Sequence, residues 1–251
     1  MKIPLALLAL LSPACFVASA HASDFLGPDF DWSGAYFGVN AGFASNDSSV
    51  SNAVKQGGET YQDLTGRIED SQSTLMGGGL VGYNIQIDHI VFGAEADINY
   101  LGFSEASSQA RNLDAYDVTQ KTSFDASWLG TLRGRLGYTV GGLLVYGTAG
   151  LAGGDMNATA SVQAVDLETG ETAKWKGSSS TTNWGWAAGA GVEYGISNVS
   201  FGLEYLYVDL GSAAWDADPT GTIPEIVDNS NAKGSVDYQF SLVRATAKLK
   251  L

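Results

Sequence analysis

Eight charged residues lie in strand-like segments, where acidic and basic side chains alternate with apolar ones. The acids are Glu95, Asp97, Glu193 and Glu204, and the bases are Arg133, Arg135, Arg244 and Lys248. Such a balanced set could conduct protons or ions along a path, or it could pair acids with bases in a protein interior. Pairing is the simpler interpretation, because packed charges need partners. The proton or ion path stays open as an alternative.

Residues for catalysis are scarce in this chain. Of the two histidines, His21 lies in an N-terminal segment that we expect to be removed, and His89 falls in a short polar turn at Ile87-Asp88-His89. A Ser-His hydrolase needs its histidine beside a serine and an acid. The single cysteine, Cys15, lies in the same N-terminal segment, which excludes a histidine-and-cysteine metal cluster from the mature chain. We therefore expect no enzyme activity, no cofactor and no metal site.

The elements that position the charges are predicted from the spacing of the polar links. Eight strand-like segments are joined by long links at 45–73, 103–122, 155–181 and 212–234 and by short turns at 87–89, 139–142 and 195–198. In outer-membrane barrels the short turns are periplasmic and the long loops extracellular. The pattern predicts an all-β fold, an eight-stranded antiparallel transmembrane up-and-down β-barrel with four long extracellular loops and three short periplasmic turns.

Alternation within the strands decides which side chains face lipid, because neighbouring residues of a strand point to opposite sides. In residues 128–138 the even positions are Trp, Gly, Leu, Gly, Leu and Tyr, whereas Arg133 and Arg135 share the odd positions. An arginine facing lipid at the bilayer midplane costs ~2–4 kcal/mol, so the odd positions must face the lumen. The lumen of so small a barrel is filled by side chains, and we expect the eight charges to form a paired polar plug there. The register of residues 143–154 is ambiguous.

Aromatic residues gather at the ends of the predicted strands. Those beside the short turns are Tyr83, Tyr138 and Tyr194, and those toward the long links are Tyr100, Trp128, Trp184, Trp186 and Tyr207. Aromatic side chains are enriched at both interfaces of membrane barrels. The pattern therefore predicts two membrane-interface girdles, whereas general aromatic enrichment of strands would predict no clustering at their ends.

The N-terminus has the pattern of an export signal. Lys2 provides a positive start, residues 3–18 are largely apolar, and Ala20-His21-Ala22 offers the small residues that a signal peptidase reads. Cleavage before Ser23 is expected, with Ala18-Ser19-Ala20 as an alternative site. The chain then divides into a signal peptide (1–22), a short periplasmic N-terminal segment (23–31) and a transmembrane barrel domain (32–251).

Composition narrows the class of protein further. The 27 acids and 13 bases give a net charge of −14, which argues against nucleic acid as a partner. Glycine accounts for 32 of the 251 residues and proline for 5, a mixture that suits strands curving into a small barrel. The acidic links are expected to keep the surface solvated, with divalent cations bridging them to lipopolysaccharide phosphates as an alternative.

Five segments resemble, in order, the strands of a known family. They are WSGAYFGVNAG (32–42), FGAEAD (92–97), WLGTLRGRLGY (128–138), GAGVEY (189–194) and LEYLYVDLG (203–211). Over nearly all of the mature chain, the sequence resembles the small outer-membrane proteins of alphaproteobacteria, the RopB group within the OmpA-like barrels. One departure is the final Leu251, because such barrels usually end in an aromatic residue that the assembly machinery recognises.

The resemblance implies a structural protein and surface antigen of the cell outer membrane, which contributes to envelope integrity and host-facing display. Implied partners are outer-membrane lipid and lipopolysaccharide, the outer-membrane assembly machinery with periplasmic chaperones, and a host ligand at the loops. Two other functions stay open. A loop-mediated binding module for haemin or a host ligand would use tyrosines such as Tyr61 or Tyr116, and a narrow channel would use the lumen.

Overall fold

The computed structural model describes residues 28–46, 49–56, 59–60, 66–69, 72–113, 116–217, 219–222 and 230–251. The predicted signal peptide and both of its cleavage sites lie outside these residues, as does most of the predicted segment 23–31. Among the described residues, no helix is long and apolar enough to cross a membrane.

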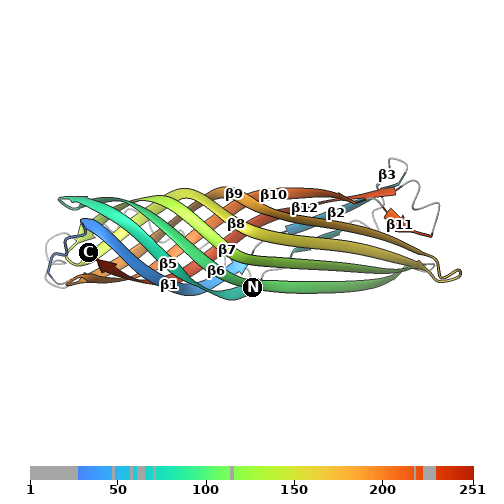
Figure 1. The fold of residues 1–251 in the computed structure, drawn as a ribbon, viewed down its shortest axis with the longest axis horizontal. Coiled ribbons are helices and arrows are strands. Elements are labelled where there is room, and N and C mark those ends of the chain that lie inside the picture. Colours follow the sequence, from blue (N-terminus) through green and yellow to red (C-terminus); the bar gives the residue numbers. More distant parts are fainter. Residues whose placement is uncertain are drawn as a thin grey trace, which may run out of the picture.

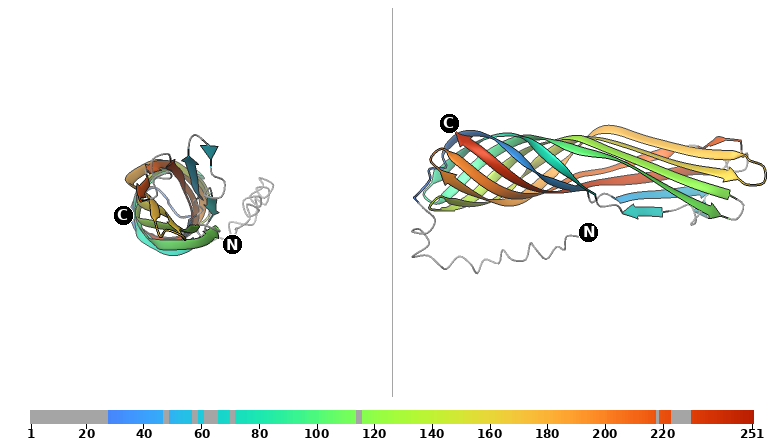
Figure 2. Two further views of the ribbon diagram at one scale, coloured as in Figure 1. Left: turned by 90° about the vertical axis from the view of Figure 1, so that its right-hand side faces the viewer. Right: turned by 90° about the horizontal axis from the view of Figure 1, so that it is seen from below.

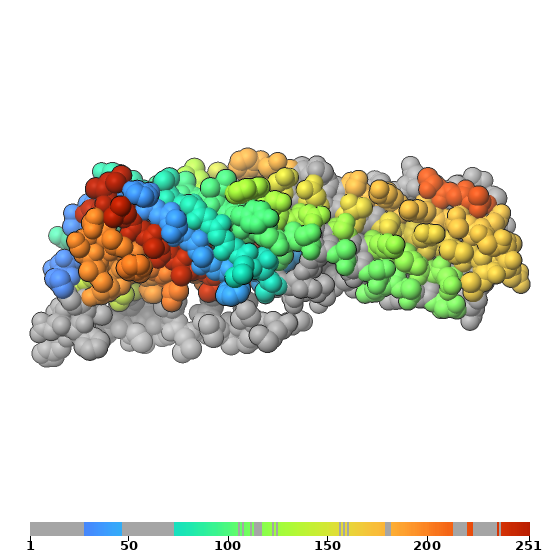
Figure 3. Space-filling view, turned by 60° about the horizontal axis from the view of Figure 1, so that its bottom comes forward, coloured from blue at the N-terminus to red at the C-terminus, as the bar shows by residue number. Residues whose placement is uncertain are grey.

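Eight long strands form a closed antiparallel barrel, which appears end-on as a ring in Figure 2. In order around the barrel they are β1 (Gly34–Asn46), β5 (Gln72–Ile87), β6 (Ile90–Leu113), β7 (Tyr116–Val140), β8 (Leu143–Asp166), β9 (Thr172–Ile196), β10 (Val199–Ala217) and β12 (Ser230–Lys250) (Figure 1). The ring closes because β12 pairs with β1, from Tyr36↔Lys250 to Asn46↔Phe240. On the surface at this closure, β1 lies between β12 and β5 (Figure 3). The predicted fold is confirmed.

Tight two-residue turns join the strands at one end of the barrel. They are Asp88-His89 between β5 and β6, Gly141-Gly142 between β7 and β8, and Ser197-Asn198 between β9 and β10. The first residue of each turn has a positive φ, of 53° to 59°. Because a turn of defined length sets the register of its hairpin, Tyr138 lies opposite Val145. This pairing resolves the register of residues 143–154 and points Tyr146 into the lumen.

The connections at the other end are as long as predicted, but much of their length is paired strand. β6 and β7 pair as far as Leu113↔Tyr116, and β8 and β9 as far as Val165↔Thr172. The predicted links 103–122 and 155–181 therefore continue the barrel strands as a sheet, which we call the extension (Figure 2). These residues form paired strands where we predicted loops, because two strands that leave the barrel side by side can continue to exchange backbone hydrogen bonds.

The remaining two long connections contain short strands. The link 45–73 holds β2 (Ser49–Gln56), β3 (Glu59–Thr60) and β4 (Gly66–Glu69), and β2 pairs with β12. The link 212–234 holds β11 (Pro219–Gly221), which pairs with β9. These additions widen the extension beyond the strands of the barrel itself (Figure 1).

The outer wall of the barrel carries the large apolar side chains of the alternating pattern. The aromatic residues proposed for the girdles all belong to this outward face, where seven are exposed and Tyr207 is half-buried. Toward the extension, the rings of Tyr100 and Trp128 lie 5.5 Å apart, as do those of Trp186 and Tyr207. The wall between the two aromatic levels is the part that hydrocarbon chains would contact.

Leu132 offers a test of this assignment, because it is 59% exposed on β7 midway between Trp128 and Tyr138. We expect Leu132→Arg to lower the free energy of unfolding in lipid vesicles by ~2–4 kcal/mol, since lipid would surround the guanidinium. Equilibrium denaturation of the refolded protein measures this loss.

The matched control is Ser104→Arg, which places the same side chain on an exposed outward position of β6 beyond Tyr100. The control should change the free energy of unfolding by no more than about 1 kcal/mol. Equal losses for the two variants would contradict the lipid-facing assignment.

Candidate functional site

The structure brings all eight predicted charges together inside the barrel. Each is at most 6% exposed, and their ionic groups form one connected set of ion pairs, which we call the charge network. Its members come from β6, β7, β9, β10 and β12, and alternation points each of them into the lumen. Because burial removes the charges from water, each must be compensated by an opposite charge.

Two arginines hold the half of the network nearer the extension. Arg133 donates to Asp97 Oδ2 at 2.7 Å and to Glu204 Oε1 at 2.9 Å. Arg244 donates to the same two oxygen atoms, at 3.1 and 2.8 Å. β7 and β10 are not neighbours in the barrel, so the pair of Arg133 and Glu204 crosses the lumen. Two guanidinium groups and two carboxylates thereby neutralise each other in a closed cycle.

A lysine and an arginine hold the half nearer the short turns. Lys248 Nζ donates to Glu193 Oε1 at 2.5 Å and to Glu95 Oε2 at 2.7 Å. Arg135 Nη2 donates to the same oxygen of Glu193 at 2.6 Å. Glu95 joins the two halves, because its other oxygen accepts from Arg133 Nη2 at 2.8 Å. The network is therefore continuous along the lumen.

Two tyrosines that the sequence analysis did not assign also belong to the network. Tyr36 Oη donates to Glu95 Oε2 at 3.0 Å and accepts from Arg135 Nη1 at 3.0 Å. Tyr146 Oη donates to Glu204 Oε2 at 2.7 Å, and the guanidinium of Arg135 lies 4.0 Å from the centre of its ring. The sequence did contain a signal for Tyr146: the two-residue turn before β8 fixes the register of that strand, and this register points Tyr146 into the lumen.

Glycines on neighbouring strands make room for these tyrosine rings. A Cβ added to Gly82 would lie 2.3 Å from the ring of Tyr36, and one added to Gly191 would lie 2.7 Å from Cζ of Tyr146. Each glycine is the direct cross-strand partner of its tyrosine. The ring thus occupies the volume in which the partner's side chain would otherwise lie.

An apolar layer closes the lumen on the extension side of the charge network. All eight barrel strands contribute to this layer, which consists of Ala44, Met76, Leu101, Phe103, Ala126, Leu129, Ala152, Ala187, Leu206, Val208, Leu210, Tyr238, Phe240 and Leu242. Every one of these residues is buried. The sequence analysis predicted a polar plug and did not foresee this layer.

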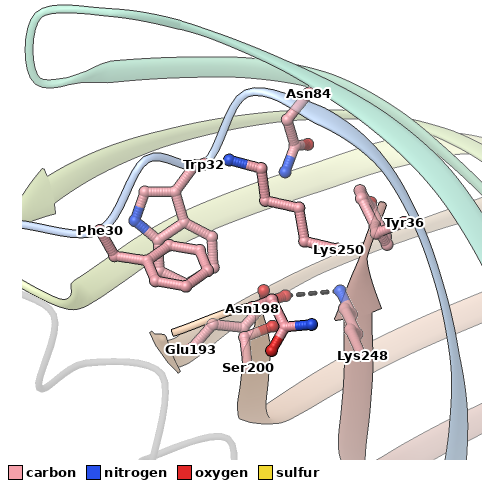
Figure 4. Close-up of a pocket in the computed structure, with 9 residues that line it drawn as sticks. All are labelled: Phe30, Trp32, Tyr36, Asn84, Glu193, Asn198, Ser200, Lys248 and Lys250. Atoms are coloured by element: carbon pink, nitrogen blue, oxygen red, sulfur yellow. Dashed lines mark hydrogen bonds and ion pairs between the residues drawn. The ribbon is translucent and has the colours of Figure 1, made fainter. Parts of the chain in front are cut away.

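A second apolar cluster closes the mouth at the short-turn end. Phe30 and Trp32, which precede β1, pack there with three inward residues of the barrel, Val91, Leu144 and Tyr146. Figure 4 shows both rings at the mouth, and their centres are 4.6 Å apart. The predicted boundary at residue 32 therefore separates residues that pack together in the same mouth.

Polar contacts hold this N-terminal strap, residues 30–33, against the barrel. Lys250 Nζ donates to the carboxylate of Asp31 at 2.8 Å. The backbone N–H of Trp32 donates to Gln86 Oε1 at 2.8 Å, and the N–H of Gln86 donates to Ser33 Oγ at 3.0 Å. Part of the predicted periplasmic N-terminal segment (23–31) thus packs into the mouth of the barrel, because the ring of Phe30 has a buried surface to cover.

A small cavity remains between the strap and the charge network (Figure 4). Trp32, Asn84, Ser200, Glu193 and Lys248 contribute to its walls, and its volume of about 10 Å³ is near the minimum for one water molecule. The cavity therefore has no room for a substrate. The charges beyond it contact each other, and both ends of the network are covered by apolar side chains.

Other residues singled out from the sequence lie away from the network. His89 is exposed in the turn between β5 and β6, where its ring lies 5.7 Å from that of Tyr138. Tyr61 lies outside the described residues, and the side chain of Tyr116 is likewise outside the described part. The described part of the structure therefore does not show where the two tyrosines considered for haemin binding lie.

A family model and several curated relatives match most of this chain. The family described as Outer membrane protein beta-barrel domain matches residues 6–240. The chain is 35% identical over 216 residues to the 31 kDa outer-membrane immunogenic protein of Brucella melitensis biotype 1, covering 79% of this chain and 84% of the relative. It is 34% identical over 160 residues to the 22 kDa outer membrane protein of Rhizobium leguminosarum bv. viciae, covering 63% of each. Among solved structures, the outer membrane protein OprG of Pseudomonas aeruginosa aligns with a TM-score of 0.44 at 17% identity, covering 90% of this chain and 99% of that one.

Removing one arginine tests the energetic role of the charge network. Arg133→Met keeps apolar bulk but leaves Asp97 and Glu204 short of a buried partner, and we expect a loss of about 3–5 kcal/mol in the free energy of unfolding in vesicles. Lys121→Met removes an exposed charge from the same strand and should change stability by less than about 0.5 kcal/mol.

Adding Glu204→Gln to Arg133→Met should cost less than the sum of the two single variants, by about 0.5–3 kcal/mol, because contacting residues are coupled. Strictly additive losses would show that the two side chains do not interact. Gel mobility of unboiled samples reports whether each variant has formed the closed barrel.

The strap should respond to acid. A hydrogen bond with Lys250 is the main cause that lowers the pKa of Asp31 in the folded protein. The ion pair therefore stabilises the docked strap above the ordinary aspartate pKa of about 3.9, and this contribution is lost as the pH falls through the lowered pKa. The indole N–H resonance of Trp32 should shift over that acidic range. In Asp31→Asn the resonance should stay constant, and an identical titration of both proteins would contradict this origin.

Proposed function

Since this chain belongs to the family of outer membrane protein beta-barrel domains and is located in the outer membrane, we propose that it is a structural barrel and surface antigen that contributes to envelope integrity, without catalysis. Its family and its location agree with the resemblance found in the sequence. The proposed roles in display and in the envelope are taken up in turn below.

The occupied lumen is the observation that carries the structural role. An apolar layer from all eight strands, the charge network and the strap with Phe30 and Trp32 follow one another along the barrel axis. Ions would have to displace paired charges and then cross buried apolar side chains, which is unfavourable in both layers. This arrangement favours a stabilised wall element over a channel.

The extension supports the role in display. Its strands keep their pairing beyond the aromatic level, so the tip between β8 and β9 is held at a distance from the barrel on a backbone scaffold. At the tip between β8 and β9, the N–H groups of Glu168 and Thr169 donate to Asp166 Oδ1 at 2.8 and 2.9 Å. Hydrogen bonds from the backbone of Thr169 and then Glu168 lower the pKa of Asp166. A tip of defined shape on a stiff support is suited to recognition by antibodies.

A pair of epitope tags tests surface display in a strain that lacks the chromosomal copy. A tag inserted between Thr169 and Gly170 should bind antibody on intact cells, because this turn lies at the outer end of the extension. The control tag, inserted between Asp88 and His89, should bind antibody only after the outer membrane is permeabilised. Labelling of the control tag on intact cells would reverse the proposed orientation.

The same strains test the role in the envelope. Loss of the protein should increase sensitivity to vancomycin and to detergent, and the tagged forms that assemble should restore resistance. Unchanged sensitivity of the strain without the protein would remove the envelope role and leave display intact. The two parts of the proposal can therefore fail separately.

A further inference from the structure

Three exposed lysines lie together on the outward face of the extension. Lys121 on β7 and Lys176 on β9 flank Ser161 of β8 in one cross-strand row. With a strand spacing of about 4.8 Å, their Cα atoms are roughly 10 Å apart. Lys174 precedes Lys176 by two residues and shares its face. We call Lys121, Lys174 and Lys176 the lysine face.

The immediate neighbours of the lysine face are neutral and polar. Ser108 and Ser161 lie beside Lys121, and Gln163 lies beside Lys174, with Thr119 next in the same row. The other cross-strand neighbour of Lys174 is Thr220 on β11, so no direct cross-strand neighbour of these lysines among the described side chains is a carboxylate. The chain as a whole is acidic, with 27 acids and 13 bases. The lysine face differs from it, because it presents positive charge with hydroxyl and amide groups around it.

The lysine face lies well outside the aromatic level of the barrel. Lys176 precedes the outward Trp184 by eight residues on the same strand. At about 3.3 Å per residue and a strand tilt of 35–45°, the lysine lies roughly 20 Å beyond that tryptophan along the barrel axis. The outward surface thus changes from apolar to aromatic to polar and basic as it leaves the membrane.

We propose that the lysine face binds the anionic saccharide core of the lipopolysaccharide that surrounds the barrel in the outer leaflet. The core carries phosphate and carboxylate groups on sugars rich in hydroxyl groups. Lysine binds such anions as a mobile point charge, and the serine, threonine and glutamine side chains can exchange hydrogen bonds with sugar hydroxyls. The proposal rests on the surface orientation proposed above, which places the extension on the saccharide side.

The test compares three glycolipids on the refolded full barrel in nanodiscs. They are lipopolysaccharide with a complete core, the same material after chemical removal of its phosphates, and lipid A alone. We expect the triple variant K121Q/K174Q/K176Q to bind the complete material about tenfold more weakly than the wild type, because exposed charge pairs are individually weak but act together here. Lipid A should bind equally to both proteins, and dephosphorylation should reduce the difference between them.

The matched control is K121R/K174R/K176R, which keeps the three charges and should retain the affinity. The exposed positions leave the core unchanged, and unboiled gel mobility verifies that each variant is a closed barrel. Equal affinity of the glutamine variant and the wild type for the complete core would overturn the proposal. An equal loss toward lipid A would place the contact at the headgroup and would also overturn it. Tighter, competing binding of a sulfated polysaccharide such as heparin would reassign the face to a host ligand.

Failure of this inference can be told apart from failure of the proposed function. Antibody labelling at Thr169–Gly170 on intact cells, together with unchanged binding by the glutamine variant, would remove the lysine face alone. Labelling of the control tag at Asp88–His89 on intact cells would instead reverse the barrel, and the lysine face would then have no lipopolysaccharide to contact.

Discussion

The sharing of two carboxylates by two arginines across the lumen is the interaction on which the rest of the barrel depends. Arg133 and Arg244 both contact Asp97 and Glu204, and these four residues come from four different strands. Compensation requires all four strands to be in one register, because a slip of one residue would turn a charge toward lipid. The energetic penalty for an unpaired buried charge thus acts as a constraint on the closure of the whole ring.

The apolar layers strengthen this constraint. They cover both ends of the charge network with apolar side chains, and the low polarity there makes each ionic contact stronger and each missing partner more costly. Tyr146 donates to Glu204 Oε2, the oxygen that the bases leave available, and Tyr36 donates to Glu95 Oε2 beside Lys248. The same arrangement that stabilises the barrel also fills the path that a channel would need, so the stability of the barrel and the filling of its lumen have one origin.

Outside the lumen, the same strands serve two environments. Near the short turns their outward residues suit lipid, and beyond Trp128 and Trp184 their outward residues are mainly polar. Continued pairing of β6 to β9 allows the membrane wall to extend into a surface sheet without a break in the backbone hydrogen bonds. The proposed display and the proposed saccharide contact therefore depend on a scaffold that is anchored by the charge network inside the membrane.

The sequence by itself determined which side of β6, β7, β9, β10 and β12 faces the lumen, and therefore which eight charges enter it, because alternation is a local property of strands. For residues 143–154 of β8, the alternation left the register ambiguous. Other features depended on tertiary structure. A bulge beside Ser127 shifts the pairing between Ala126 and Trp128, so that Ala126 and Leu129 both join the apolar layer. The docking of Phe30 and Trp32 required a mouth built from distant strands. Which of the inward residues contact one another was decided by which strands lie near each other in the closed barrel. Contacts between residues far apart in the chain leave no local pattern in the sequence.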